Sequence, residues 1–115
     1  MSNAIWALIY DITEENLGEY LAWFHEVHIP EKLARDGYEW AGHYKGCSQQ
    51  STRYIAFFGG ISTRTFFDPS PKQLKTTQDE LTRKMIGMRQ NPCALVFAEE
   101  WDVEGPNINK RPGDA

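Results

Sequence analysis

The chain has 115 residues and a formal net charge of −4, with 41% hydrophobic and 24% charged residues. This length favours one domain that buries about two-thirds of its unfolded surface. The basic residues are scattered, so we expect no nucleic-acid partner, because phosphate contacts need clustered Lys and Arg. No stretch approaches the ~20 apolar residues of a membrane span. The amino terminus lacks the charged-then-apolar pattern of a signal peptide, so we expect a cytoplasmic protein without a membrane partner.

The first part of the chain predicts a strand followed by a helix. Residues 4–12, AIWALIYDI, are a nearly continuous apolar run, typical of a strand covered on both faces. Thr13 offers an N-cap, and residues 17–28 then carry apolar side chains at spacings of three and four. Pro30 disfavours helical geometry in the residue before it. We therefore expect the helix to end there, with His28 in its last turn.

The remaining chain predicts three more strands and a second helix. Residues 38–46 alternate as a strand does, and the turn SQQST leads into another strand at 53–61. Ser70-Pro71 and Gln73 form a capping-box pattern, which starts a helix that stops before Asn91. Residues 93–103 predict the fourth strand. Five basic residues at helical spacings predict a solvated helix face: Lys72, Lys75, Arg83, Lys84 and Arg89.

The order β-α-β-β-α-β predicts a ferredoxin-like α+β fold. Right-handed crossovers give a four-stranded antiparallel sheet in the order 4-1-3-2, with both helices on one face. Strands one, three and four are apolar on both faces, so the uncovered face needs a partner. A second copy is the simplest cover, and we expect a homodimer. The domain spans residues 1–103, and residues 104–115 form a polar tail.

The two cysteines predict neither a disulfide scaffold nor a metal knuckle, because Cys47 and Cys93 are too few and too far apart. In the expected sheet they lie at opposite edges, whereas a bridge needs Cα atoms within about 7 Å. We expect two small, reduced, mostly buried residues.

Two histidines in the first helix are candidates for chemistry. His25 and His28 are three residues apart and can point the same way. A metal site needs a third and usually a fourth ligand; His43 or Glu31 could serve, but no ligand motif supports this, so we expect no metal. At a helix end, the macrodipole would favour a protonated His28 able to act in acid–base chemistry. The alternative is a structural His28 bonded to a terminal carbonyl, with a solvated His25.

Residues 20–44, YLAWFHEVHIPEKLARDGYEWAGHY, resemble the EthD-type branch of the dimeric α+β barrel superfamily. The match consists of an aromatic-x-x-x-x-His-x-Pro pattern at Trp23, His28 and Pro30, followed by a turn at Gly37. The order of elements over residues 4–103 also matches. The resemblance implies a barrel closed by two sheets, a cavity in each protomer, and the helix-end histidine at the cavity mouth.

The resemblance implies small-molecule chemistry without naming a reaction. The superfamily includes isomerases, cyclases, decarboxylases and monooxygenases that are cofactor-free or bind haem, and many members have no established activity. By this resemblance His28 is the first candidate catalytic residue. His43 and Tyr44 in the second strand come next, because acid–base chemistry wants a second polar group at the same cavity. Their side chains alternate, so at most one of them faces the cavity.

Three functions therefore stay open. The first is a cofactor-independent enzyme that moves a proton on a small, apolar, oxygenated compound. The second is a non-catalytic ligand-binding or dimerisation module, and the third is a monooxygenase. No Asn, Trp and Phe arrangement marks a haem site, so we expect no cofactor. Seven aromatic residues could line a ligand pocket or could equally form core and dimer interface: Trp6, Tyr10, Trp40, Tyr44, Tyr54, Phe58 and Trp101.

Overall fold

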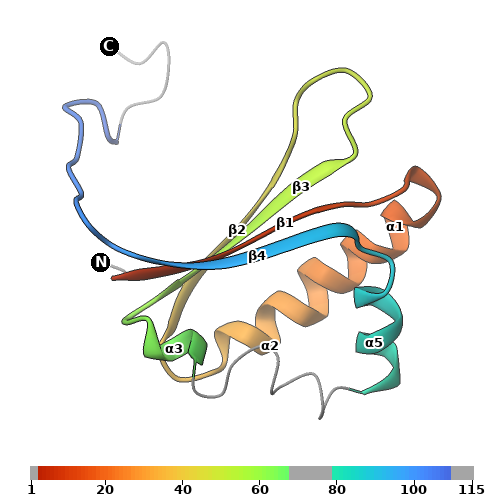
Figure 1. Ribbon diagram of the computed structural model, residues 1–115, viewed down its shortest axis with the longest axis horizontal. Helices are drawn as coiled ribbons and strands as arrows, with labels where there is room; N and C mark the ends of the chain where they lie inside the picture. The colour runs from red at the N-terminus through yellow and green to blue at the C-terminus, as the bar shows by residue number, and fades with distance from the viewer. Residues whose placement is uncertain (1–2, 68–78, 110–115) are drawn as a thin grey trace.

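A four-stranded antiparallel sheet forms one layer of the molecule (Figure 1). The structure is a computed structural model that describes residues 3–67 and 79–109. The strands are β1 (Ala4–Asp11), β2 (Tyr38–Lys45), β3 (Arg53–Gly60) and β4 (Gln90–Ala98). Their spatial order is β2-β3-β1-β4 and every neighbouring pair is antiparallel. The predicted ferredoxin-like α+β fold and its strand order are confirmed.

The described helices form a second layer on one side of the sheet, as Figure 1 shows. They are α1 (Glu14–Trp23), the π-helix η1 (Phe24–His28), α2 (Ile29–Leu33), the short α3 (Arg64–Phe67) and α5 (Glu80–Ile86). No helix in the described part of the chain is both long and apolar enough to cross a membrane.

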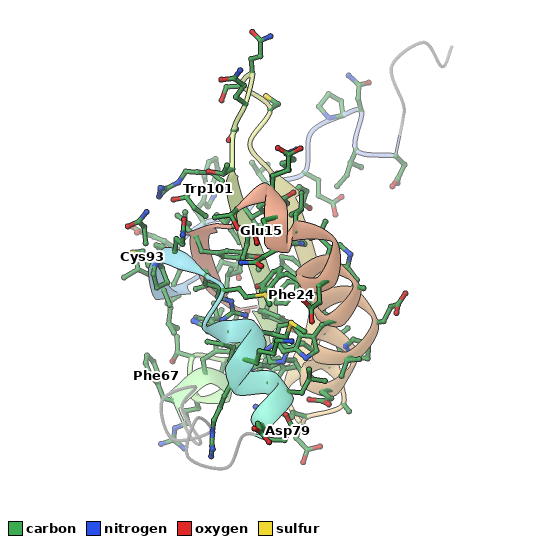
Figure 2. All side chains as sticks on the ribbon, turned by 90° about the vertical axis from the view of Figure 1, so that its right-hand side faces the viewer. Glu15, Phe24, Phe67, Asp79, Cys93 and Trp101 are labelled. Atoms are coloured by element: carbon green, nitrogen blue, oxygen red, sulfur yellow. The ribbon has the colours of Figure 1, made fainter. Side chains whose placement is uncertain are left out.

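Alternation along the strands separates a helix-covered face from an open face. On the helix-covered face, Trp6 and Tyr10 of β1 pair with Phe58 and Tyr54 of β3 and are buried with Phe24. Figure 2 places Phe24 inside the molecule, beside the helix that carries it. The open face consists of the alternate residues Ile5, Ala7, Ile9, Trp40, Tyr44, Ile55, Phe57, Cys93, Leu95 and Phe97.

The open face is apolar, and none of the helices in residues 3–67 and 79–109 lies over it (Figure 1). Leu95 is 54% exposed and Phe97 is 49% exposed, although both lie in a sheet strand. Trp40 crosses the strand next to it, and a side chain at Gly59 would collide with its indole ring. The structure therefore contains the exposed apolar sheet face for which a covering partner was predicted.

The first helical segment does not end at Pro30, which corrects the sequence prediction. Ile29 has helical angles, and its N–H bonds to the carbonyl of Phe24, five residues back. This π-turn places Pro30 in the first turn of α2, where a missing N–H costs no hydrogen bond. The helix continues to Leu33. His28 therefore lies inside a helical run, not in its last turn, and the macrodipole argument for its protonation does not apply.

The second predicted helix also begins elsewhere. Asp79 is extended, and its carboxylate caps α5 by accepting the N–H of Thr82 at 2.7 Å. A helix that runs unbroken from Pro71 is therefore wrong, and the capping box predicted at Ser70 lies outside the described residues. α3 was not predicted; it forms in the expected loop because Phe66 is completely buried against Trp6 and Tyr38.

The fourth strand is shifted toward the amino terminus from its predicted place at 93–103. β4 begins at Gln90 and contains Pro92, which an edge strand tolerates. The register shifts by one residue between Ile9 and Asp11 of β1, and Asn91 has a φ of 51° at this irregularity. The chain leaves the sheet after Ala98, and Trp101 beyond it is 82% exposed.

The expectation of mostly buried cysteines is wrong. Cys47 and Cys93 are both free and both exposed. Cys47 follows β2 in the hairpin, while Cys93 pairs with Ile9 and faces the open side of the edge strand β4 (Figure 2). Both are at the surface because the β2–β3 hairpin extends beyond the body of the molecule and no described helix covers the open face (Figure 1).

Candidate functional site

Three polar side chains form a continuous hydrogen-bonded row under the helix-covered face. His43 of β2 pairs with Ala56 and so points toward the helices. Its Nε2 lies 2.5 Å from the hydroxyl of Tyr10, and its Nδ1 lies 2.9 Å from Nε2 of His25 in η1. Tyr10 is completely buried, whereas His25 is exposed. The row therefore connects the surface with the core.

Tyr20 and Arg89 extend this row at its buried end. The Nε of Arg89 donates to the hydroxyl of Tyr20 at 2.8 Å. The rings of Tyr20 and Tyr10 meet edge to face at 5.5 Å, and each phenol affects the pKa of the other. We call the five residues His25, His43, Tyr10, Tyr20 and Arg89 the relay.

The guanidinium of Arg89 is held over three aromatic rings. Its central carbon lies 5.4 Å from the ring centre of Tyr10, 5.8 Å from that of Tyr20 and 5.7 Å from that of Phe24. Such cation–π contacts stabilise a positive charge that has little water around it. The prediction that Arg89 belongs to a solvated helix face is therefore wrong. It lies between α5 and β4, so the helical spacing no longer applies to it.

The relay can carry its protons in two directions. In one arrangement, Tyr10 donates to Nε2 of His43, and Nδ1–H of His43 donates to His25. In the other, each of these donors becomes an acceptor, and His25 donates inward. Each imidazole nitrogen and hydroxyl serves in either role, depending on the tautomer. The row can therefore reverse the direction of its hydrogen bonds between His25 and Tyr10, and a proton enters or leaves at the exposed His25 end, because Arg89 at the buried end only donates.

Burial keeps His43, Tyr10 and Tyr20 neutral near pH 7. Burial, followed by the charges of His25 and Arg89, lowers the pKa of His43 to about 4. Burial and the neighbouring Tyr20 raise the pKa of Tyr10. Burial also raises the pKa of Tyr20, although the Arg89 charge opposes this. His43 is thus an unprotonated base beside a protonated phenol.

His28 lies next to the relay but is not bonded to it. It is only 6% exposed, its ring stacks on Trp23 at 4.5 Å, and its Nδ1 has no hydrogen-bond partner. Burial, followed by the charges of Lys32, Arg89 and Arg35, lowers its pKa to about 3. The expected imidazolium is therefore wrong for this environment, because a buried charge without a partner is costly.

The structure brings two of the three predicted site residues near each other. The rings of His28 and His43 both contact Phe24, at 5.7 and 4.6 Å between centres. Tyr44 points the other way: it pairs with Ile55 on the open face and packs against Phe57 at 5.8 Å. This is the alternation expected of neighbouring strand residues.

Two surface hollows lie away from these histidines. One, of about 460 Å³, lies at the end of the open face between Trp40, Phe97 and Trp101. The other, of about 450 Å³, lies near the β2–β3 turn and includes Leu17, Lys45 and Tyr54. Neither is lined by His28, His43 or Tyr44. Phe24, which both histidine rings contact, is itself completely buried.

Metal binding would need more ligands than this site offers. His25 and His43 present two imidazoles, and within residues 3–67 and 79–109 no third His, Cys, Asp or Glu joins them in a group that could hold an ion. The imidazole nitrogens that face each other already share a hydrogen bond. The arrangement suits proton transfer rather than coordination.

Sequence reasoning missed most of the relay. Tyr10 stood only among possible pocket aromatics, Tyr20 belonged to the apolar stripe of the helix, and His25 was expected to be solvated. A usable signal was present: Tyr10 lies on the same strand face as Trp6, and that face packs on the helix that carries His25 and His28. Nothing local in the sequence placed Arg89, because the contact with Tyr20 spans 69 residues.

The structure resembles several solved proteins, although no family model and no curated protein matches the chain. A dimeric ferredoxin-like protein from an uncultured marine organism has a TM-score of 0.65 and 17% identity, covering 90% of this chain and 95% of that one. SnoaB, a cofactor-independent oxygenase from Streptomyces nogalater, has a TM-score of 0.66 and 9% identity, covering 89% and 97%.

A third similar structure is the ActVA-Orf6 monooxygenase of Streptomyces coelicolor in complex with the ligand nanaomycin D. Its TM-score is 0.64 at 9% identity, and the match covers 90% of this chain and 93% of that one. At these identities the likeness concerns the fold. The chain thus has the ferredoxin-like α+β fold that these proteins share.

Proposed function

We propose that the protein is a cofactor-independent enzyme that moves a proton on a small, largely apolar, oxygenated compound. The observation that carries this proposal is the relay, in which the exposed His25 is connected through His43 to the buried phenol of Tyr10. His43 satisfies the buried hydroxyl of Tyr10, and the exposed His25 at the other end of the row is open to a bound substrate. The row suits a site where a proton is taken up and later returned.

His43 is the acid–base group in this proposal. It is partly exposed, neutral near pH 7 and bonded to a donor on one side and a second imidazole on the other. A substrate that binds at the His25 end gives its proton to the histidine pair and becomes an anion. The two imidazoles share the positive charge, and the new anion raises their proton affinity, because opposite charges stabilise each other.

The other two predicted catalytic residues receive different roles. We propose that His28 contacts the substrate from the far side of Phe24 and does not act as the first base, because its environment keeps it neutral. We assign Tyr44 to a subunit interface, since it belongs to the open face.

A homodimer through the open face is part of the proposal. The exposed apolar side chains of Leu95, Phe97 and Tyr44 give a second copy a large surface to bury. The dimeric ferredoxin-like protein of similar fold supports the same arrangement.

We also propose membership of the EthD-type branch. Gly37, in the matching motif, has a φ of 86° and no room for a side chain beside Thr65, which explains the glycine at this turn.

Proton exchange on a simple ketone tests the catalytic proposal without knowledge of the natural substrate. The protein is incubated in D₂O with 2-tetralone, an apolar ketone with acidic C–H bonds, and loss of the proton signal is followed by NMR. We expect catalysed exchange that falls by about a hundredfold in His43→Gln, the lower range for removal of a general base. Tyr44→Phe, on the opposite sheet face, is the matched control and should exchange at the original rate.

Equal exchange by the original protein and His43→Gln would contradict the role of His43. No exchange above the buffer rate on this ketone, together with a fully folded protein, would favour the non-catalytic module, whose expected feature is a filled interior such as the one around Phe24.

A monooxygenase is the second candidate, favoured by the fold shared with a cofactor-independent oxygenase and a monooxygenase. The relay would form a carbanion that reacts with O₂. Anthrone is a suitable probe, because its oxidation by O₂ gives anthraquinone and water. Oxygen uptake that depends on anthrone and on His43, in chelator-treated buffer, would support this candidate over an isomerase or decarboxylase.

A further inference from the structure

A second polar cluster lies along α2, separate from the relay. His28 and Lys32 are one turn apart and point the same way. They are only 6% and 4% exposed, respectively. The Nζ of Lys32 lies over the ring of Trp6 at 4.9 Å. We call the polar atoms of Trp23, His28, Lys32, Arg35 and Tyr38 the donor cluster.

Most of these polar atoms have no hydrogen-bond partner. Of the five buried side-chain atoms that lack one in the described part of the chain, four belong to this cluster: Trp23 Nε1, His28 Nδ1, Arg35 Nη1 and the Tyr38 hydroxyl. The guanidinium of Arg35 lies close enough to the Tyr38 hydroxyl to oppose the rise in its pKa, so these two groups partly satisfy each other. Buried polar groups in native proteins are almost always paired. The unpaired atoms of Trp23 and His28 therefore indicate that something is missing from this place.

The chemistry of the cluster indicates what is missing. The indole N–H, the guanidinium and the ammonium can only donate hydrogen bonds, while imidazole and phenol can donate as well as accept. Lys32 and Arg35 form no ion pair with any described carboxylate. The missing group must supply acceptor atoms and negative charge, which an anionic oxygen group does.

Aromatic rings surround the cluster and set the shape of its ligand. Trp6 stacks on Phe58 at 5.4 Å, and Tyr38 meets Phe66 edge to face at 5.3 Å. Trp23 stacks on His28. An apolar, flat body beside a charged oxygen fits such walls better than a small hydrated anion.

We infer that the donor cluster binds the anionic oxygen group of a flat aromatic molecule, in the first instance a carboxylate, through Lys32, Arg35 and His28. The inference rests on the proposed function for its substrate class. It adds that the substrate carries an anionic group, which anchors it on the α2 side of Phe24 while the reacting carbon lies toward His43.

The surrounding charges make this binding dependent on pH. Burial, followed by the charges of Arg35 and Arg89, lowers the pKa of Lys32 to about 7, while Glu31 opposes this. Lys32 must be protonated to pair with an anion, so binding should weaken as the pH rises above 7. His28 faces the same ligand and, with its low pKa, contributes as a neutral donor over this range.

Benzoate is the probe for the test, and the quenching of tryptophan fluorescence is the readout, because Trp6 and Trp23 border the cluster. Saturable quenching is expected at pH 6.5 and is expected to be at least about tenfold weaker at pH 8.5. Benzamide, which has the same shape without the charge, should bind about tenfold more weakly or worse.

Variants distinguish benzoate binding at the donor cluster from nonspecific attraction of benzoate to positive charges. Lys32→Met keeps the packing and should weaken benzoate binding by about tenfold, while Lys32→Arg should retain it. Lys84→Met is the matched control, since Lys84 is exposed and pairs with Glu19 at 3.0 Å. Circular dichroism confirms that each variant is folded.

Equal affinity for benzoate and benzamide, or for the original protein and Lys32→Met, would overturn the inference and would indicate that water fills the cluster. Absence of saturable quenching up to the solubility limit would overturn it as well. Neither result depends on catalysis, so the ketone exchange experiment fails or succeeds separately from this one.

Discussion

The two faces of the sheet differ in burial and in polarity, although their residues alternate along the same four strands. On the helix-covered face, His43 and Tyr10 form hydrogen bonds among buried aromatic rings. On the open face, the alternate residues of the same strands, such as Tyr44 and Leu95, are apolar or aromatic and exposed. One position along a strand thus decides whether a residue lies among the buried hydrogen-bonded groups or on the open apolar face. Alternate residues of a strand point to opposite faces, so the environment of a histidine or tyrosine here depends on its position in the strand as much as on its residue type.

The largest expected effect is on the stability of the helix-covered face. Phe24 is completely buried and touches His28, His43 and Tyr20. Phe24→Ala should lower the free energy of unfolding by about 3–5 kcal/mol, the usual loss for a core phenylalanine. Urea unfolding followed by far-ultraviolet circular dichroism measures this. A loss below about 1 kcal/mol would mean that the interior is not packed around this ring.

Substitutions on the open face should change the dimer dissociation constant rather than the stability of the folded subunit. Leu95→Lys places a charge in the proposed interface and should raise the dimer dissociation constant by at least about a hundredfold, since like charges facing each other cost several kcal/mol. Analytical ultracentrifugation measures the constant. Lys84→Met, on a helix away from the sheet, is the control. An unchanged constant, or a protein that is already monomeric at micromolar concentration, would remove the proposed dimer.

Removal of one hydroxyl from the relay should have an intermediate effect. Tyr10→Phe leaves the Nε2 of His43 without its partner, so we expect a loss of about 1–2 kcal/mol in the free energy of unfolding. The same change at Tyr44, on the open face, should be nearly neutral in the monomer. If urea unfolding gives equal losses for the two variants, the Tyr10 hydroxyl contributes nothing specific.

Acidification should destabilise the helix-covered face. The pKa values of His28 and His43 are lowered from 6.5 to about 3 and about 4, respectively. The unfolded chain therefore binds more protons than the folded one between about pH 6.5 and pH 4, so stability is present above this window and falls as the pH drops through it. Urea midpoints measured across this range check the sign.

His28→Leu sharpens the same experiment because it removes one of the two titrating groups. Its urea midpoint should change less between pH 6.5 and pH 4 than that of the original protein. A midpoint that rises on acidification would contradict the burial of neutral imidazoles.

The smallest effect concerns the reactivity of the two thiols. Cys93 belongs to the open face and Cys47 to the hairpin after β2, and both are exposed in a single subunit. In the proposed dimer, Cys93 is covered and should react with a thiol reagent about tenfold more slowly than Cys47, since reaction then requires the interface to open. Equal rates at high protein concentration would place Cys93 outside the interface.

The fold could be predicted because its determinants are local and periodic. The apolar run of β1, the alternation of β2, the turn signals around β3 and the order of elements were sufficient for the sheet order. The prediction failed at Pro30 because the π-turn rearranges the helix bonds around the proline. It failed at Asp79 because a single capping side chain resets where a helix begins.

The candidate site could be predicted only in part. His43 and His28 were named from a short motif and from strand parity. Their protonation was not predictable, because it depends on burial and on Lys32 and Arg89, which come from different elements. The division of the chain at residue 103 and the catalytic role of His28 stay predictions.

The protonation state of His43 is decisive for the relay, because the relay requires a neutral imidazole that is bonded on both sides. Long-range ¹H–¹⁵N NMR of the histidine rings, recorded from pH 8 down to acid, reports the charge and the tautomer of each ring. The account predicts that His43 stays neutral at pH 6 and titrates near pH 4, with Tyr10→Phe changing its tautomer signals. Titration of His43 near its ordinary value of 6.5, unaffected by Tyr10→Phe, would contradict the relay.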